Sequence, residues 1–226
     1  LSQNIALIEL RCANNQLTTL DVAQNTALID LFCYNNQLTS LDVTGAIALD
    51  TLYCPNNQLT NLDVSQNTAL TYLSCSQNQL YNLDLTQNTA LTNLNCSLND
   101  LTSLDVSQNT ALTNLNCWGN EIQILDLSQN IAFTSLDVEN NILTCLNVQN
   151  GNNHNLTITD ISGNPWLTCI QVDDVAYSTA NWTNIPATLF SASCNNDCSG
   201  TSNLTEYNSN QPKELIKIIN LLGQEV

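Results

Sequence analysis

Basic side chains are scarce in this chain. Its 226 residues include only 3 Lys and Arg against 20 Asp and Glu, and the formal net charge is −17 at pH 7. Such a surface repels the phosphates of nucleic acids and the acidic headgroups of lipids. We therefore expect no nucleic-acid partner. Basic surfaces and divalent cations are the partners that this charge favours.

Histidine is rare, and glycine-rich loops and long apolar runs are missing. The one histidine, His154, lies in an Asn-rich segment, so no Ser-His-Asp or Cys-His pair and no zinc site can be assembled. No phosphate-binding Gly motif occurs. These absences predict a protein that is not an enzyme and has no cofactor. No run of about 18 apolar residues exists, which argues against membrane insertion. Leu1 stands in mid-pattern, which favours a processed or trimmed chain.

What the chain has in abundance is a 21-residue repeat. Three residue types recur at this interval without a change of step. A strict period predicts a stack of near-identical units instead of one irregular core. The columns are Cys12, Cys33, Cys54, Cys75, Cys96 and Cys117; Asn15, Asn36, Asn57, Asn78, Asn99, Asn120 and Asn141; and Asp21, Asp42, Asp63, Asp84, Asp105 and Asp126.

Each unit contains two segments with the alternation of a β-strand. In residues 7–27, Leu10 and Cys12 alternate with polar neighbours, and Leu20 and Val22 alternate around Asp21. One unit cannot enclose its own apolar side chains, so stacking of neighbours must bury them. We therefore predict a repeat solenoid with a parallel β-sheet on one face and few helices.

The cysteine and asparagine columns have structural interpretations. Cysteine occupies a leucine-like inward position, and adjacent parallel strands offer poor disulfide geometry, so inert reduced thiols are expected. Asparagine side chains can satisfy backbone groups that the turns of a solenoid bury.

The repeat pattern Leu-x-x-Leu-x-Cys-x-x-Asn-x-Leu-x-x-Leu-Asp-Val-Ser-x-Asn resembles leucine-rich repeats. Its 21-residue length and cysteine column resemble the internalin type, and internalin J-like repeats most of all; the match covers about residues 4–175. The resemblance implies a right-handed superhelix and a secreted or cell-surface recognition and adhesion protein. The helical N-terminal cap of internalins is missing from the match.

The repeat spacing slips after Asn141, which predicts a closing unit. We divide the chain into a solenoid (1–175), a C-terminal cap (176–198), a linker (199–212) and a final segment (213–226). Four cysteines outside the column suggest two disulfides. Cys169–Cys194 with Cys145–Cys198 is the favoured pairing, and the swapped pairing stays open. Candidates for the lid over the apolar end are Trp166, Val175, Tyr177, Trp182, Leu189 and Phe190.

The final segment, residues 213–226, resembles a strand region of the C-terminal sorting domain used by type IX secretion, in truncated form. This resemblance implies export, and a place outside a bacterial cell or on its outer surface. The alternative is an amphipathic strand that joins another element.

Side chains beside each first segment should point outward on the sheet. Exposed aromatic residues gathered on one face usually mark recognition, although aromatics also suit strands in general. We predict that this face binds a protein on a host or neighbouring cell. A glycan is the alternative, and an ice or mineral surface is another, because Thr71, Thr92, Thr113 and Thr134 form a hydroxyl column. The predicted contact residues are Arg11, Phe32, Tyr34, Tyr53, Tyr72 and Trp118.

The aspartate column is a weaker candidate, for a cation. Stacked carboxylates repel each other or recruit cations, and Asp63, Asp84 and Asp105 are the candidates for calcium. One carboxylate per repeat supplies few of the six to eight oxygen ligands that calcium takes. Hydrogen bonds from nearby turn hydroxyls and amides are therefore the expected role of these residues.

Overall fold

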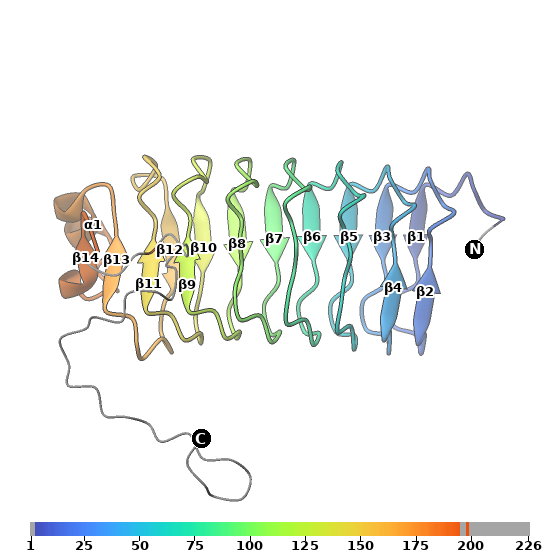
Figure 1. Ribbon diagram of the computed structural model, residues 1–226, viewed down its shortest axis with the longest axis horizontal. Coiled ribbons are helices and arrows are strands. Elements are labelled where there is room, and N and C mark those ends of the chain that lie inside the picture. Colours follow the sequence, from blue (N-terminus) through green and yellow to red (C-terminus); the bar gives the residue numbers. More distant parts are fainter. Residues whose placement is uncertain (1–2, 195–197, 199–226) are drawn as a thin grey trace, which may run out of the picture.

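The computed structural model describes residues 3–194 and 198, and shows an elongated parallel β-solenoid closed at one end by short helical elements (Figure 1). Its main sheet has eight parallel strands in the order β1-β3-β5-β6-β7-β8-β10-β12. They are β1 (Glu9–Arg11), β3 (Asp30–Phe32), β5 (Thr51–Tyr53), β6 (Tyr72–Ser74), β7 (Asn93–Asn95), β8 (Asn114–Asn116), β10 (Ser135–Asp137) and β12 (Thr157–Asp160).

The 21-residue period sets the register of this sheet. Leu10 pairs with Leu31, and Leu31 with Leu52, so equivalent residues form straight rows. The central leucine of each strand, replaced by Ile158 in β12, points inward, and its two neighbours point outward, as the pleat requires. The register shifts only between β10 and β12, after Leu136, where the repeat spacing slips in the sequence.

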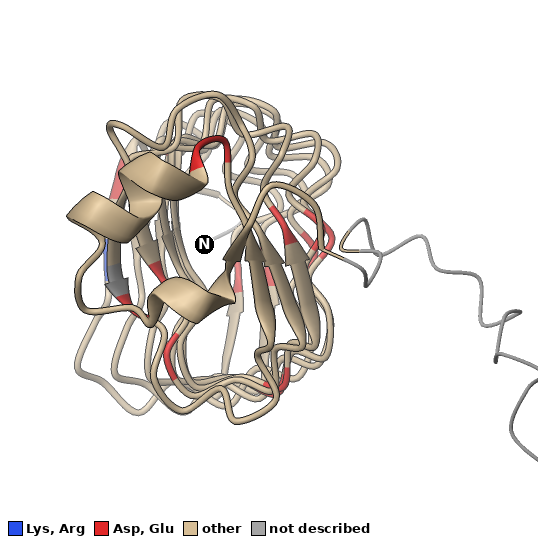
Figure 2. Cartoon of the chain, turned by 90° about the vertical axis from the view of Figure 1, so that its left-hand side faces the viewer, with Lys and Arg blue, Asp and Glu red and all other residues tan. Residues whose placement is uncertain are grey.

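The second extended segment of each repeat forms strands only toward the two ends of the rod. β2 (Thr19–Asp21) pairs with β4 (Ser40–Asp42), and β9 (Ile124–Asp126), β11 (Cys145–Asn147), β13 (Cys169–Gln171) and β14 (Phe190–Ser191) form a four-stranded sheet. The view along the rod shows strands on two opposite sides of the tube, with acidic residues on both (Figure 2). In the repeats between them, Leu62 and Val64 are still buried without a β-ladder. Burial of alternate side chains therefore holds these segments in place.

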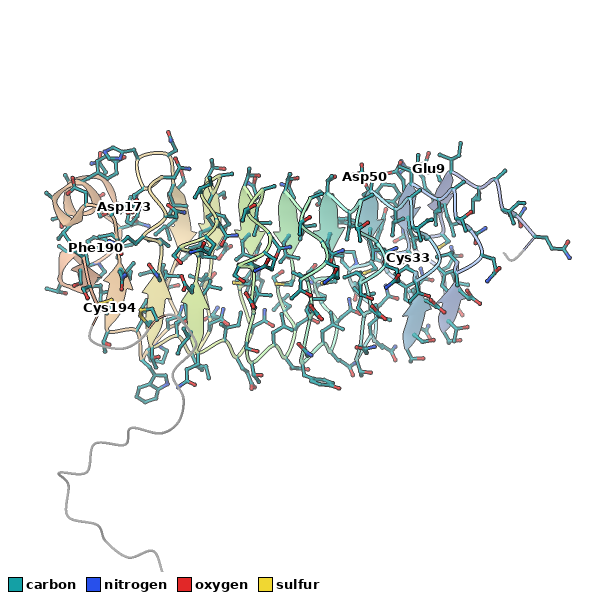
Figure 3. The ribbon with its side chains drawn as sticks, turned by 45° about the horizontal axis from the view of Figure 1, so that its top comes forward. Glu9, Cys33, Asp50, Asp173, Phe190 and Cys194 are labelled. Carbon is teal, nitrogen blue, oxygen red and sulfur yellow. A yellow bond between two sulfur atoms is a disulfide. The ribbon has the colours of Figure 1, made fainter. Side chains whose placement is uncertain are left out.

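The cysteine column lies inside the rod. Cys33 through Cys117 are fully buried, Cys12 is half-buried, and all six are free thiols (Figure 3 labels Cys33). Burial, with a smaller contribution from Cys12, raises the pKa of Cys33 to about 12. Burial likewise raises the pKa of Cys75 to about 12. A thiol held neutral in this way is a poor nucleophile.

The asparagine column cross-links consecutive repeats. The amide nitrogen of Asn57 donates to the carbonyl oxygens of Cys33 and Cys54, each at 3.1 Å, and its oxygen accepts from the backbone N–H of Leu38 at 3.0 Å. The same pattern recurs at Asn36, Asn78, Asn99, Asn120 and Asn141. Buried turn groups are satisfied by these side chains, as the sequence predicted.

The cap begins with α1 (Val175–Asn181), whose N-terminus is capped by Asp174 through the backbone N–H groups of residues 176 and 177. After η1 (Ala187–Leu189), β14 extends the second sheet. The ring of Trp182 meets that of Phe190 edge-on at 5.7 Å, and both are buried. Trp166, predicted as part of this lid, is 63% exposed, since it follows Pro165 at a turn on the outside of the rod. In the described part no helix is long and apolar enough to cross a membrane.

Two disulfides tie the cap to the solenoid. The structure joins Cys145 to Cys198 and Cys169 to Cys194, with Cα–Cα distances of 5.5 and 5.9 Å. This is the favoured one of the two pairings that the sequence left open. The predicted linker (199–212) and final segment (213–226) lie outside the described residues.

Candidate recognition surface

Four aromatic side chains meet on the outer face of β3, β5 and β6. The in-register stacking of repeats places Phe32 beside Tyr53, with ring centroids 6.2 Å apart, and Tyr53 beside Tyr72, stacked at 6.3 Å. Tyr34, just after β3, meets Tyr53 edge-on at 5.3 Å. We call Phe32, Tyr34, Tyr53 and Tyr72 the aromatic cluster. Tyr53 is at its centre, because it touches each of the other three rings.

Arg11 extends the cluster toward the N-terminal end. Its guanidinium carbon lies 4.3 Å from the centroid of the Phe32 ring, a cation–π contact, and its side chain also forms an ion pair with Glu9. The Arg11 side chain is still 68% exposed. It is the single Lys or Arg side chain of the described part, and Glu9 balances its charge.

Trp118, the sixth predicted contact residue, lies apart from the aromatic cluster. It follows β8, three repeats beyond Tyr53, and its ring contacts none of the aromatic rings in the described part. Its backbone N–H donates to the side-chain oxygen of Asn116. The structure therefore brings together five of the six predicted residues.

The aromatic side chains add little charge to this face. Partial burial, and next the neighbouring Tyr53, raise the pKa of the Tyr72 hydroxyl. The Tyr72 hydroxyl is therefore uncharged over the physiological range. Directly before β5, the Asp50 carboxylate accepts a hydrogen bond from the Thr71 hydroxyl at 2.6 Å (Asp50 is labelled in Figure 3).

A shallow hollow of about 250 Å³ follows the aromatic cluster along the same face. The polar outward residues of β7, β8 and β10 line it, with Tyr72 at one side. In the sequence these residues form an Asn- and Ser-rich series at the outward strand positions. The sequence alone gives no reason to group them as a site. Partial burial raises the pKa of Asp137 here, against the hydrogen bond from the Glu139 N–H.

The aspartate column acts in turn formation. Each candidate carboxylate accepts from the backbone N–H two residues ahead: Asp63 from Ser65, Asp84 from Thr86 and Asp105 from Ser107, each at 2.9 Å. Hydrogen bonds from the Ser65 hydroxyl and N–H lower the pKa of Asp63, and those from Thr86 lower the pKa of Asp84. None of these three joins a group of three or more possible metal ligands in the described residues. The group found there is Cys145, Cys194 and Cys198, all engaged in disulfides.

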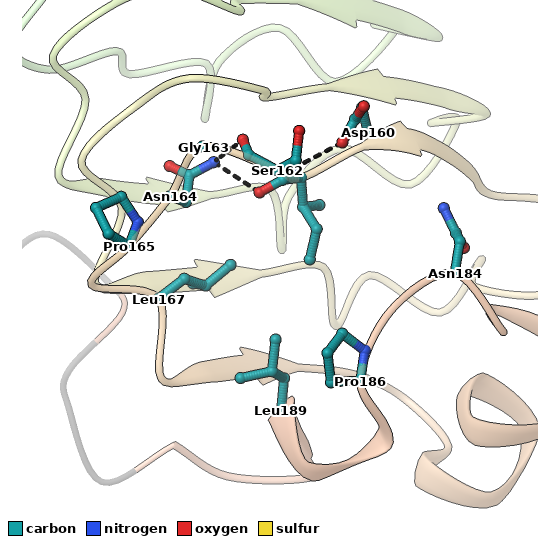
Figure 4. Close-up of a pocket in the computed structure, with 10 residues that line it drawn as sticks. Asp160, Ser162, Gly163, Asn164, Pro165, Leu167, Asn184, Pro186 and Leu189 are labelled. Carbon is teal, nitrogen blue, oxygen red and sulfur yellow. Dashed lines mark hydrogen bonds between the residues drawn. The ribbon is translucent and has the colours of Figure 1, made fainter.

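A hollow of about 650 Å³ lies at the C-terminal end, between the turn after β12 and the cap (Figure 4). The turn after β12 forms one wall, where the amide nitrogen of Asn164 donates to the carbonyl oxygens of Ile161 and Ser162. Pro186 and Leu189 of the cap form the other. Among the described residues that line it, Asp160 is the titratable one, and its carboxylate accepts a hydrogen bond from the backbone N–H of Ser162.

No protein-family model matches this chain, and no curated protein matches it. Solved structures do. The functional domain of InlJ from Listeria monocytogenes, which includes a cysteine ladder, is 30% identical with a TM-score of 0.57 over 76% of this chain and 51% of that one. A leucine-rich repeat protein of Leptospira interrogans is 27% identical with a TM-score of 0.65, covering 72% and 45%.

An internalin, InlF of Listeria monocytogenes, shares the fold at 22% identity and a TM-score of 0.56, covering 76% and 48% of the two chains. The chain spans about half the length of these three structures. The prediction of a leucine-rich repeat solenoid of internalin type, with 21-residue repeats and a cysteine ladder, is confirmed.

Proposed function

We propose that this chain, a leucine-rich repeat solenoid of the internalin J type, is a non-enzymatic recognition module that binds a protein partner through the aromatic cluster. The observation that carries the proposal is the contact of Phe32, Tyr34, Tyr53 and Tyr72 on one outward face, with Arg11 at its end. Tyr and Arg, together with Trp, are enriched at the energetic centres of protein interfaces. The likeness to leucine-rich repeat structures supports protein interaction as the general role.

We further propose that the module works outside a bacterial cell, as an adhesin on a host or neighbouring cell surface. Two disulfides support this, because such bonds persist in oxidising compartments. The sorting-domain resemblance of residues 213–226 supports it independently. An ice- or mineral-binding role is less favoured, because the Thr92 and Thr113 hydroxyls, each at 3.0 Å, donate to backbone carbonyls of the preceding repeat.

The test is capture of partner proteins from host or matrix extracts by the immobilised chain. The variant Phe32→Ala/Tyr53→Ala/Tyr72→Ala should lose the captured protein, with at least a ~30-fold drop in affinity from the loss of ~2 kcal/mol or more. The matched control is Tyr81→Ala/Trp166→Ala, which removes two aromatics that are 65% and 63% exposed elsewhere. Circular dichroism checks that both variants fold. Equal capture by the triple variant and the parent would refute the proposal.

A further inference from the structure

The hollow beside the aromatic cluster has a second kind of chemistry. We call it the asparagine hollow. It is formed by outward side chains of four consecutive strands, β6, β7, β8 and β10, and holds about 250 Å³. Its lining combines amides, a serine hydroxyl, one carboxylate and one tyrosine ring. The side chains that face outward in it are Tyr72, Asn93, Asn95, Asn114, Asn116, Ser135 and Asp137.

Backbone groups fix the orientation of two of these amides. The side-chain oxygen of Asn95 accepts from the N–H and the hydroxyl of Ser97, at 3.1 and 2.8 Å. The oxygen of Asn116 accepts from the N–H of Trp118 at 3.2 Å. A backbone N–H can only donate, so the amide oxygen must face it. The amide nitrogens of Asn95 and Asn116 then point away from these partners, and within the described part they donate to nothing.

The other two amides lie beside hydroxyl groups. The Thr92 hydroxyl is 2.9 Å from the side-chain oxygen of Asn93, and the Thr113 hydroxyl is 2.7 Å from that of Asn114. Each hydroxyl has one proton and also lies 3.0 Å from a backbone carbonyl oxygen, so these contacts do not fix the orientation of either amide. The register pairs Asn93 with Asn114 and Asn95 with Asn116 on neighbouring strands, which lie ~4.8 Å apart. The amides thus form a two-by-two array, in which the NH₂ groups of Asn95 and Asn116 are donors whose oxygens are already occupied.

The remaining side chains of the hollow supply further acceptors and an apolar surface. The Ser135 hydroxyl and the Asp137 carboxylate add acceptors, and the Tyr72 ring, 37% exposed, adds an apolar surface at the rim. A fitting ligand carries acceptors and hydroxyl donors close together and has an apolar face. The net charge of −17 disfavours an anion. The volume suits a small molecule or one end of a chain.

We propose that the asparagine hollow binds an uncharged saccharide, one pyranose unit lying against Tyr72 with its hydroxyl and ring oxygens on the amide array. Sugar hydroxyls donate as well as accept, so they pair with Asp137 and with the amide nitrogens at once. This site goes beyond the protein recognition proposed above, and does not require it. The two sites share Tyr72 but differ in every polar contact.

The test is binding of the full chain to an array of neutral and acidic glycans, followed by calorimetry with a neutral oligosaccharide that scores positive. The variant Asn95→Asp/Asn116→Asp keeps the oxygens that Ser97 and Trp118 use and replaces each free NH₂ with an acceptor. We expect at least a tenfold loss of affinity. Asn61→Asp/Asn82→Asp, on exposed positions of the second segments, makes the same charge change and should bind as the parent does.

Several results would overturn the proposal. They are no binding to any neutral glycan of the array, binding to acidic glycans alone, and equal affinity of the parent and Asn95→Asp/Asn116→Asp. A loss as large in Asn61→Asp/Asn82→Asp would also do so, since net charge would then be the cause. The variant Phe32→Ala separates the two proposals, because it removes part of the protein-binding cluster and should leave saccharide binding unchanged.

Discussion

Removal of one asparagine from the cross-linking column should destabilise the whole rod. In Asn57→Ala, the backbone N–H of Leu38 loses the one hydrogen-bond acceptor it has in the described part, and the carbonyl oxygens of Cys33 and Cys54 lose a donor. Asn57 is only 8% exposed, so water cannot readily replace it. A buried polar group left without a partner costs ~1–3 kcal/mol. We therefore expect a loss of about 2–4 kcal/mol.

The assay is urea unfolding followed by far-ultraviolet circular dichroism, comparing midpoints and slopes. Asn15→Ala is the matched control. Asn15 belongs to the same column but is exposed and donates only within its own repeat, to Cys12 and Ala13. The control should lose less than about 1 kcal/mol. If Asn57→Ala unfolds at the same urea concentration as Asn15→Ala, the cross-link between repeats does not stabilise the rod as argued.

Four further outcomes are expected. Thiols in the unfolded chain lose their protons near pH 8.5, whereas Cys33 and Cys75 in the folded chain keep theirs up to about pH 12. The free energy of unfolding should therefore be highest below pH ~8.5 and fall as the pH rises toward 12. A urea midpoint that is unchanged between pH 8 and 11 would contradict this. Iodoacetamide at pH 8 should modify only half-buried Cys12 in the folded chain and all six column thiols in urea, as counted by mass spectrometry. Leu98 has a positive φ of 52° where most equivalent positions hold Asn or Gly, so Leu98→Asn should stabilise by about 1 kcal/mol in the same urea assay, and a loss would contradict the strain argument. Millimolar calcium should leave Tm unchanged, because Asp63, Asp84 and Asp105 already accept turn hydrogen bonds; a rise of several degrees that a chelator reverses would restore the cation hypothesis.

The periodic part of this fold could be predicted in detail because each position repeats. A column of Leu or Cys at 21-residue spacing can only be an inward row, and Asn57 or Asn78 in the same frame must meet the same backbone groups in every turn. Strand formation in the second segments was harder to predict. Leu41 and Leu62 stand in the same Leu-Asp-Val pattern and both are buried, yet Leu41 belongs to β4 and Leu62 to no strand. The difference lies in the ladder hydrogen bonds and not in which side chains are buried.

The candidate site was partly visible in the sequence. The period alone aligns Phe32, Tyr53 and Tyr72 on neighbouring strands, so their contact follows from register. Trp118 shares their face but is too many repeats away to touch them. The orientation of the Asn95 amide depends on the N–H of Ser97, a three-dimensional contact that no spacing rule expresses. In the turn before β13, Trp166 faces solvent instead of closing the rod.

The most direct test of the recognition surface is site-specific photo-cross-linking in the presence of the partner. A benzophenone amino acid replaces Tyr53, at the centre of the aromatic cluster, or Tyr81, which is 65% exposed and outside the main sheet. We predict that the partner protein cross-links to position 53 and not to position 81. Cross-linking at position 81 with none at position 53 would show that the partner binds another face of the rod.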